Sequence, residues 1–276
     1  MNNRVFRGCG VALATPFRGG EVDWEALRKL IVRQLDAGTD ALILCGTTGE
    51  PSTLTQEEKE GIWRLGVELA AGRVPVIAGT GGNNTAAVVA LSRRAQELGA
   101  DGLLLVTPYY NKATQQGLVE HFTRVADAVD IPMILYNVPG RTGLNMLPET
   151  AARLCEHQNI AGVKEASGDI SQAAELIRLC PGAAIYSGND DQTLAFLALG
   201  AQGVISVAAN LVPERMRALT GAFFAGNLQA AQEEQLSLLP LIRQLFAQVN
   251  PIPLKAALHE LGLCENELRL PLTPGR

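Results

Sequence analysis

The residue with the clearest capacity for chemistry is a lysine that ends an apolar run. Lys164 follows residues 160–163, Ile-Ala-Gly-Val, a sequence typical of a buried strand. An ammonium held partly out of water has a lowered pKa, so part of the population is the neutral amine that attacks a carbonyl carbon. The alternative is a lysine that extends to solvent or pairs with a carboxylate such as Glu165. Position alone leaves both interpretations open.

The other lysines of the chain have different surroundings. They are Lys29, Lys59, Lys112 and Lys255. Each falls in a predicted helix or in a loop, where we expect a solvated ammonium. Lys164 is therefore the strongest candidate for a chemical role among the lysines.

A turn rich in glycine and threonine follows another apolar run. The sequence at 46–50 is GTTGE. Backbone N–H groups of such a turn can converge on a carboxylate, and the hydroxyls of Thr47 and Thr48 add donors. No lysine follows the second glycine, so the turn does not match a phosphate-binding loop. An ordinary glycine-rich turn remains the alternative.

Tyrosines and an arginine follow two further apolar runs. Tyr109 and Tyr110 stand in the sequence TPYYN after one run, and Tyr136 closes the next. A phenol beside a forming imine can both donate and accept a proton. Packing in the core or at an interface is the alternative, above all for Tyr109. Arg141 lies in the loop after Tyr136, where a guanidinium can bind a substrate carboxylate or form a structural ion pair.

The elements that must position these residues are short strands alternating with amphipathic helices. The strands are mostly continuous apolar runs, as expected of parallel strands buried on both faces. Eight are predicted, at residues 10–14, 41–45, 76–78, 102–106, 133–136, 162–164, 184–187 and 203–206. Eight strand–helix units favour a closed (β/α)8 barrel, or TIM barrel, over an open sheet. The C-terminal ends of the strands then carry the active site.

A weak internal repeat and a helix-start signal support this architecture. In each copy of the repeat, a glycine that can end a helix precedes a strand by a few residues. The copies lie at residues 37–44, 98–105 and 199–206. Thr55 and Glu58 form a capping-box pattern before a helix predicted at 56–71.

The chain divides into a barrel at residues 1–222 and a helical C-terminal region at residues 223–276. In the second part, helices are predicted at 227–249 and 252–261, separated by an Asn-Pro dipeptide that interrupts the helical pattern. The region is too short to be an independent domain with chemistry of its own. We interpret it as an appendage of the barrel.

Composition and charge exclude several classes of function. The chain has 276 residues, of which 47% are hydrophobic, and a net charge of −5. An acidic protein without a run of lysine and arginine is not built to bind nucleic acid. No apolar run reaches the roughly 18–20 residues that span a bilayer, and the first ten residues lack the pattern of a secretory signal. We therefore expect a cytoplasmic protein without nucleic-acid or membrane partners.

The cysteines and histidines are too scattered to suggest a metal site. The five cysteines include no CxxC pair, and none of the three histidines lies three or four residues from another. These spacings favour reduced thiols over a disulfide framework and exclude the usual zinc motifs. We expect no bound metal.

Taken together, these motifs resemble the dihydrodipicolinate synthase family of the N-acetylneuraminate lyase superfamily. The motifs that carry the similarity are GTTGE at 46–50, TPYYNK at 107–112, YNVPGRTG at 136–143, GVKEASGD at 162–169, SGND at 187–190, GVISV at 203–207 and NPIPLKAAL at 250–258. The resemblance covers nearly the whole chain. It implies a Schiff base between Lys164 and pyruvate, whose enamine condenses with L-aspartate-4-semialdehyde. The cyclised product, 4-hydroxy-tetrahydrodipicolinate, leads to diaminopimelate and lysine.

The resemblance also implies how protons move and how the protein assembles. Tyr136 matches the proton relay of the family, acting with Thr48 and with Tyr110 supplied by a neighbouring subunit. A homotetramer built from two tight dimers is therefore implied. No metal or organic cofactor is implied, because the lysine itself serves as the electron sink.

Substrate-binding roles are implied for five positions. The backbone at Thr47 and Thr48 would hold the pyruvate carboxylate, and Arg141 would bind the carboxylate of the semialdehyde. Gly188 and Ile205 match backbone positions that line the pyruvate pocket.

One departure from the family pattern concerns feedback inhibition by lysine. Gln56 and Lys59 stand where lysine-sensitive members often carry histidines, and Ala87 stands where they have a glutamate. Asn83 is retained. We therefore expect weak or no inhibition by lysine.

Two other functions stay open. A sister pyruvate-dependent aldolase, of the N-acetylneuraminate lyase or 2-keto-3-deoxy sugar acid aldolase type, would share the lysine and differ in the pocket for the second substrate. Arg141 favours a short carboxylated aldehyde over a sugar. A non-catalytic barrel that binds a small acid would be expected to lack part of the set formed by Lys164, Tyr136 and the threonines, all of which are present.

Overall fold

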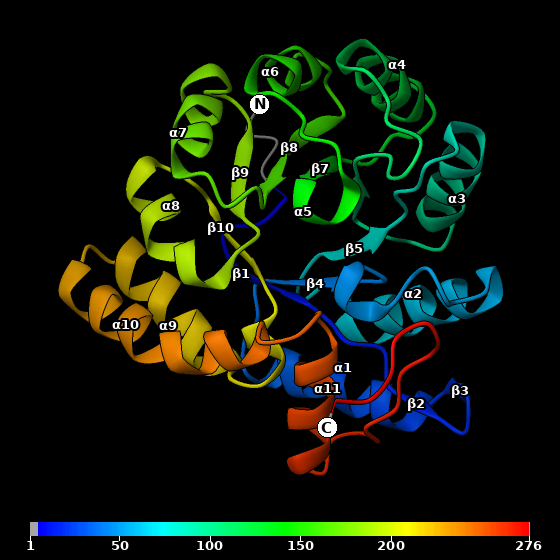
Figure 1. Ribbon diagram of the computed structural model, residues 1–276, viewed down its shortest axis with the longest axis vertical. Helices are drawn as coiled ribbons and strands as arrows, with labels where there is room; N and C mark the ends of the chain where they lie inside the picture. Colours follow the sequence, from blue (N-terminus) through cyan, green and yellow to red (C-terminus); the bar gives the residue numbers. More distant parts are fainter. Residues whose placement is uncertain (1–4, 276) are drawn as a thin grey trace.

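Eight short parallel strands form a closed barrel, with helices arranged around it (Figure 1). The computed structural model describes residues 5–275. In chain order, the barrel strands are β1 (Gly8–Ala12), β4 (Ala41–Leu44), β5 (Val76–Gly79), β6 (Gly102–Val106), β7 (Met133–Asn137), β8 (Ile160–Glu165), β9 (Ala184–Ser187) and β10 (Gly203–Ser206). Each strand pairs with the next, and β1 closes the ring by pairing with both β4 and β10. The predicted (β/α)8 barrel is confirmed.

The first strand lies two residues earlier than predicted. Gly8 pairs with Gly203, and the strand has already ended at Ala12. The reason lies at its C-terminal end, where the backbone N–H of Ala14 donates to Oδ1 of Asn210 at 3.0 Å instead of to a neighbouring strand. The apolar run continues past this point, so its composition gives no sign of the change.

The main helices alternate with the barrel strands. They are α1 (Trp24–Asp36), α2 (Gln56–Ala70), α3 (Thr85–Glu97), α4 (Gln115–Ala126), α6 (Pro148–Cys155), α7 (Ile170–Leu179), α8 (Thr193–Leu199) and α9 (Pro213–Phe224). The predicted capping box at α2 is confirmed: the Thr55 hydroxyl accepts from the N–H of Glu58, and the Glu58 carboxylate accepts from the N–H of Thr55. Both side chains thereby satisfy donors that the first helical turn leaves unpaired.

Several short elements were not predicted from the sequence. They are the hairpin β2 (Phe17–Arg18) and β3 (Glu21–Val22), the 3₁₀ turns η1 (Thr47–Gly49), η2 (Asp190–Gln192) and η3 (Ala208–Asn210), and the single-turn helix α5 (Pro139–Thr142). Except for the hairpin, each lies just beyond the C-terminal end of a barrel strand. These turns bring the loop residues to the mouth of the barrel.

The C-terminal region consists of two helices and a tail. The predicted break is confirmed, because α10 (Leu228–Leu245) and α11 (Ile252–Glu260) lie on either side of it. The predicted boundary after residue 222 falls inside α9, which continues to Phe224. In Figure 1 the tail after α11, coloured red, runs back toward α2 and the β2–β3 hairpin. The division into barrel and appendage stays an interpretation.

Apolar side chains fill two separate layers. One fills the barrel interior and includes Ile43, Ile77, Ile134 and Ile205, and the other lies between the strands and the helices. Burying one such side chain contributes about 1.5–3 kcal/mol to folding. Between residues 5 and 275, no helix is both long and apolar enough to cross a membrane. The predicted lack of a secretory signal concerns the first ten residues, of which 1–4 lie outside the described part.

Candidate active site at the barrel mouth

Lys164 and Tyr136 lie side by side inside the barrel because of the strand register. Tyr136 of β7 is paired directly with Lys164 of β8, so both side chains point to the same side of the sheet. The Nζ atom of Lys164 lies 4.2 Å from the centroid of the Tyr136 ring. The two residues are only 5% and 6% exposed. The predicted strand-end lysine is therefore a buried amine beside a buried phenol.

Burial makes the Lys164 amine easier to deprotonate. It lowers the pKa of Lys164 to about 8, with a smaller contribution from the positive charge of Arg141 and opposition from the carboxylate of Asp190. At neutral pH a useful fraction of such an amine is neutral and nucleophilic. Burial also raises the pKa of the Tyr136 phenol. The phenol thus stays protonated and able to donate at neutral pH.

The alternative partner for Lys164, the neighbouring Glu165, is occupied elsewhere. Successive strand residues point to opposite faces. The Glu165 carboxylate accepts hydrogen bonds from Asn137 Nδ2 at 2.9 Å, from Gln172 Nε2 at 3.2 Å and from the N–H of Ser167 at 2.5 Å. It belongs to the layer between the barrel and the helices, so it does not neutralise the lysine.

The GTTGE segment forms η1, and its two threonines face different partners. The side chain of Thr47 hydrogen-bonds to the phenol of Tyr136, whose pKa this contact lowers slightly against the effect of burial. Thr48 is 2% exposed, and its hydroxyl accepts from Asn250 Nδ2 at 3.0 Å. The prediction that Thr48 joins Tyr136 is wrong in this geometry. Adjacent residues of a 3₁₀ turn point about 120° apart, so only one of the two can face the phenol.

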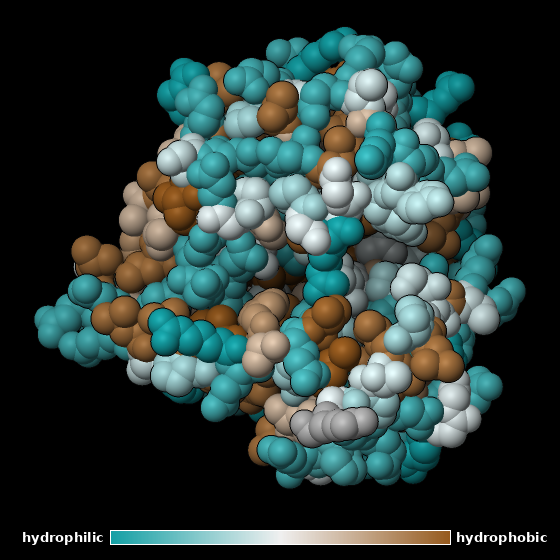
Figure 2. All heavy atoms as spheres, in the orientation of Figure 1, coloured by the Kyte–Doolittle hydropathy of each residue, from teal (hydrophilic) through white to brown (hydrophobic). Residues whose placement is uncertain are grey.

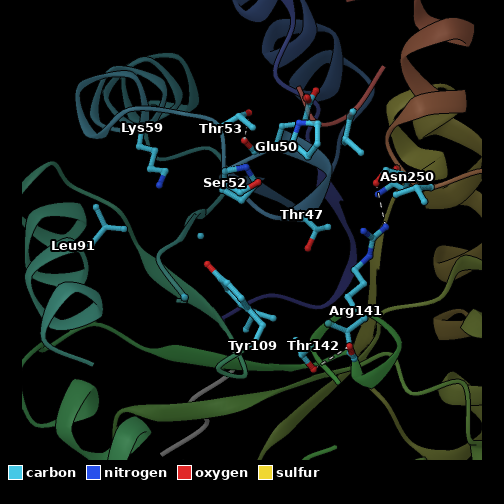
Figure 3. A pocket seen from close by; sticks show the side chains of 18 residues that line it. Thr47, Glu50, Ser52, Thr53, Lys59, Leu91, Tyr109, Arg141, Thr142 and Asn250 are labelled. Atoms are coloured by element: carbon cyan, nitrogen blue, oxygen red, sulfur yellow. Dashed lines mark hydrogen bonds between the residues drawn. The ribbon is translucent and has the colours of Figure 1, made fainter. Parts of the chain in front are cut away.

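Arg141 borders a cavity at the mouth of the barrel. It lies in α5 after β7, and its Nη2 donates to the carbonyl oxygen of Asn250 at 3.1 Å. Figure 3 shows Arg141 reaching toward Asn250, with Thr47 pointing into the same space. The cavity has a volume of about 470 Å³, and Tyr109 and Lys59 lie on its far side. Its size suits a small carboxylated molecule.

The outer surface around this mouth is largely hydrophilic. Figure 2 shows the same side of the molecule, hollowed near its centre, with apolar side chains gathered mainly over the C-terminal helices.

Gly188 follows β9, the strand beside β8, and Ile205 lies one strand further on, in β10. A Cβ atom at Gly188 would lie 3.1 Å from Cε of Lys164 and 2.5 Å from Cβ of Ala166, so no side chain fits there. Ile205 is fully buried in the barrel interior together with Tyr136. Glycine at position 188 keeps backbone close to the amine, as required of a backbone that lines a small pocket.

Tyr110 is not brought to the other site residues within this chain. Its side chain is 89% exposed, and its φ of 74° is in the left-handed region that residues with a Cβ seldom adopt. Tyr109, by contrast, lines the cavity. The structure thus presents Tyr110 outward, with an uncommon backbone conformation.

Asp190 is a site residue that the sequence reasoning did not single out. It is 1% exposed, and its Oδ2 accepts from the N–H groups of Val207 and Ala208 at 3.0 and 2.8 Å. Burial raises the pKa of its carboxyl, while these donors and the charge of Lys164 oppose the shift. The sequence carries a signal for it, because Asp190 is the last residue of the SGND motif at 187–190.

Lys255 contradicts the expectation that the remaining lysines are solvated. Its side chain is 0% exposed, and Nζ lies 2.5 Å from Oε1 of Glu50. Burial lowers the pKa of Lys255, and Glu50 opposes that shift. The helical pattern could not reveal this burial, because the contacting groups, Glu50, Phe17 and Glu267, all lie outside the helix. Among residues 5–275, no group of three or more His, Cys, Asp and Glu side chains is placed to hold a metal ion.

Comparison with known proteins gives a consistent result. The family model described as the dihydrodipicolinate synthetase family matches residues 5–276. The 4-hydroxy-tetrahydrodipicolinate synthase of Geobacter sulfurreducens is 54% identical over 271 residues, which are 98% of this chain and 93% of that protein. The synthase of Alkaliphilus oremlandii is 53% identical, with the same coverage of both chains.

Solved structures agree in both fold and sequence. The dihydrodipicolinate synthase of Thermotoga maritima superposes with a TM-score of 0.98 at 45% identity, over 99% of this chain and 94% of that one. The Acinetobacter baumannii enzyme, solved with pyruvate, superposes with a TM-score of 0.95 at 45% identity, over 97% of this chain and 93% of that one. With its barrel, its buried lysine and these relatives, the chain belongs to the dihydrodipicolinate synthase family.

Proposed function

We propose that the protein is a 4-hydroxy-tetrahydrodipicolinate synthase that condenses pyruvate with L-aspartate-4-semialdehyde. The observation that carries this proposal is the buried Lys164 amine, with its pKa of about 8, beside Tyr136. The neutral amine attacks the keto carbon of pyruvate, and loss of water leaves a Schiff base. Loss of a proton from the pyruvate methyl group gives an enamine, whose carbon attacks the aldehyde of the second substrate. The amino group of that substrate then attacks the imine carbon, closes the ring and releases Lys164.

Tyr136 is proposed as the group that moves protons during these steps. The Lys164 nitrogen lies 4.2 Å from the centroid of its ring, and in this proposal the phenol protonates the departing hydroxyl and takes a proton back. Because Thr47 is its hydrogen-bond partner, Thr47 replaces Thr48 in our proposal for the relay. Thr48 is assigned to holding the turn through Asn250.

The carboxylates of the two substrates are proposed to bind at different places. The first N–H groups of η1, at Thr47 and Thr48, suit the pyruvate carboxylate, because the start of a helical turn leaves such donors unpaired. Arg141 suits the carboxylate of the semialdehyde, because it borders the cavity and is held by Asn250. The backbone at Gly188 and Ile205 completes the wall on the pyruvate side.

Tyr110 supports a proposed assembly. Its outward side chain and positive φ suit a residue that enters the site of a neighbouring copy. We therefore propose a homotetramer made of two tight dimers, with Tyr110 completing the relay of the partner subunit. The reaction as written needs no further cofactor, and we expect the protein to act in the cytoplasm.

Reductive trapping tests the first half of the proposal. Incubation with pyruvate and borohydride should add a pyruvate-derived mass irreversibly, and peptide mapping should place it on Lys164. Lys164→Ala should abolish the adduct. Absence of any adduct on the wild-type protein would refute the Schiff-base mechanism and favour a barrel that only binds small acids.

The second substrate is tested by coupled turnover. Wild-type protein should consume pyruvate and L-aspartate-4-semialdehyde together. Arg141→Ala should leave trapping with pyruvate intact and raise the KM for the semialdehyde by about 10- to 100-fold, the scale of lost hydrogen bonds between charged groups. A wild-type protein that is trapped but does not use the semialdehyde would instead be a sister aldolase.

A further inference from the structure

The most completely buried charge outside the described site is that of Lys255. Its ammonium, on α11, contacts Oε1 of Glu50 at 2.5 Å and donates to the carbonyl oxygen of Glu267 at 2.8 Å. It also lies 4.0 Å above the ring of Phe17. Glu50, only 3% exposed, ends the GTTGE segment. The pair therefore connects the C-terminal region directly to the turn beside Tyr136.

Glu50 has a backbone conformation that needs support. Its φ of 52° and ψ of 47° are left-handed, and its N–H donates to the carbonyl oxygen of Thr47 at 3.1 Å to close η1. A residue with a Cβ adopts this conformation at a free-energy cost. The Glu50 carboxylate is held on one oxygen by Lys255 and on the other by the N–H of Arg269 at 3.2 Å. Anchoring the side chain thus helps to hold the residue that closes the turn.

We propose that Lys255 is a positioning residue for η1, holding Glu50 so that the N–H groups of Thr47 and Thr48 stay aimed at the pyruvate carboxylate. This inference rests on the proposed function of that turn. Lys255 touches neither the substrate nor the reacting atoms in this proposal. It acts through Glu50, and its effect should appear in pyruvate affinity more than in the rate at saturation.

A second contact from the same region holds the other part of the turn. Asn250, which lies just before α11, donates to the hydroxyl of Thr48 at 3.0 Å. The C-terminal region therefore contacts η1 both at its middle and at its closing residue. These two contacts define a rigid backing for a carboxylate-binding turn, which a flexible glycine-rich loop would lack.

Stabilisation of the fold alone would not require charges at this place. A buried ion pair can often be exchanged for apolar side chains of similar volume without loss of stability, whereas removal of one partner leaves an unpaired buried charge. Replacing both Glu50 and Lys255 therefore separates a role in stabilising the fold from a role in positioning η1. It can restore the fold while leaving the turn without its ionic anchor.

The test uses Lys255→Met, the double variant Glu50→Gln/Lys255→Met, and Leu258→Ala as a matched control. Leu258 is fully buried on the same helix, and its truncation destabilises α11 by creating a cavity. Each full-length protein is trapped with borohydride over a range of pyruvate concentrations, with the adduct mapped to Lys164. Thermal unfolding of each is measured in parallel.

We expect both Lys255 variants to need about tenfold more pyruvate for half-maximal trapping, the scale of a lost charged contact, with little change in the saturating rate. Leu258→Ala should keep the wild-type half-saturation. A folded double variant with wild-type half-saturation would overturn the proposal, as would an equal rise in Leu258→Ala. If Lys255→Met does not fold, the double variant decides. Failure to trap the wild-type protein would instead refute the proposed function.

Discussion

Lys164 and Lys255 are two buried lysines of one chain with opposite surroundings. Burial lowers the pKa of both ammonium groups. Among residues 5–275, however, no carboxylate lies within 4.0 Å of the Lys164 nitrogen, whereas Glu50 contacts that of Lys255 at 2.5 Å. Asp190 affects Lys164 only through its charge at longer range.

The difference shows what separates a nucleophile from an anchor. Burial disfavours the charged form of an amine that has no ionic partner, so such an amine loses its proton more easily and becomes reactive. A buried amine held by a carboxylate and a carbonyl oxygen keeps its donors occupied, so it fixes geometry. Burial alone therefore does not identify a candidate catalytic lysine. The absence of a carboxylate beside the buried amine does.

The largest expected effect is that of Lys164→Met, which should separate activity from stability. Turnover should fall by about 10⁴-fold or more, the scale seen when a nucleophile is removed. The free energy of unfolding at pH 7 should rise by roughly 1–3 kcal/mol, because the folded state no longer holds a desolvated ammonium. Steady-state assays and urea unfolding measure the two effects. A less stable variant would contradict the picture of an unpaired amine.

Lys255→Met should have the opposite effect on stability. Removing one partner of a buried pair leaves the Glu50 carboxylate uncompensated, so the free energy of unfolding should fall by about 3–5 kcal/mol. The double variant with Glu50→Gln should recover most of that loss. Denaturant titrations of the three proteins give the values. An unchanged midpoint for Lys255→Met would mean that the two lysines differ less than their contacts indicate.

The pH dependence of trapping should report Lys164 alone. Since burial lowers its pKa to about 8, the neutral fraction grows until the pH passes that value. At low, fixed pyruvate, the trapping rate should rise by nearly tenfold between about pH 6 and pH 7 and flatten above about pH 8. The buried Lys164 ammonium also lowers the free energy of unfolding. This destabilisation is complete below a pH of about 8 and disappears as the pH rises toward 10.5, the ordinary pKa of lysine. A rate that keeps rising to pH 10 would indicate an unshifted amine.

The smallest effect concerns a third lysine, Lys59, which lines the cavity at the mouth of the barrel together with Leu91 and Tyr109. Its positive charge at that wall disfavours the binding of a second ammonium group. Free lysine at millimolar concentration should therefore change turnover less than about twofold. A turnover assay over increasing lysine checks this. Half-inhibition below millimolar lysine would show that the charge of Lys59 does not prevent lysine from binding.

The sequence predicted the barrel because the fold depends on a pattern repeated along the chain. Continuous apolar runs separated by capped helices predicted all eight strands, and only the first was displaced. Lys164, Tyr136 and Arg141 were found for the same reason: the first two lie near the C-terminal ends of β8 and β7, Arg141 lies just after β7, and strand ends converge. In β7 and β8 that convergence is direct, because Tyr136 and Lys164 are paired residues.

What could not be predicted depends on side-chain direction within irregular segments. GTTGE shows two adjacent hydroxyls, but only the 3₁₀ geometry of η1 decides that Thr47 faces the phenol. Likewise, Lys255 falls in a predicted helix, where a solvated ammonium is expected, yet its side chain is fully buried. Its partners come from residues 50 and 267, and no periodic pattern connects them.

The contacts of the last part of the chain have a consequence for protein synthesis. Residues 47–50 leave the ribosome well before Asn250, Lys255 and Arg269, which contact that turn or Glu50; Thr48 and Asn250 are 202 residues apart. A nascent barrel can form its strands in order, yet η1 acquires these contacts only after the helical region that follows the last barrel strand has been made. Chains that stop before residue 250 should therefore be able to form the barrel strands while η1 lacks the contacts of Asn250 and Lys255.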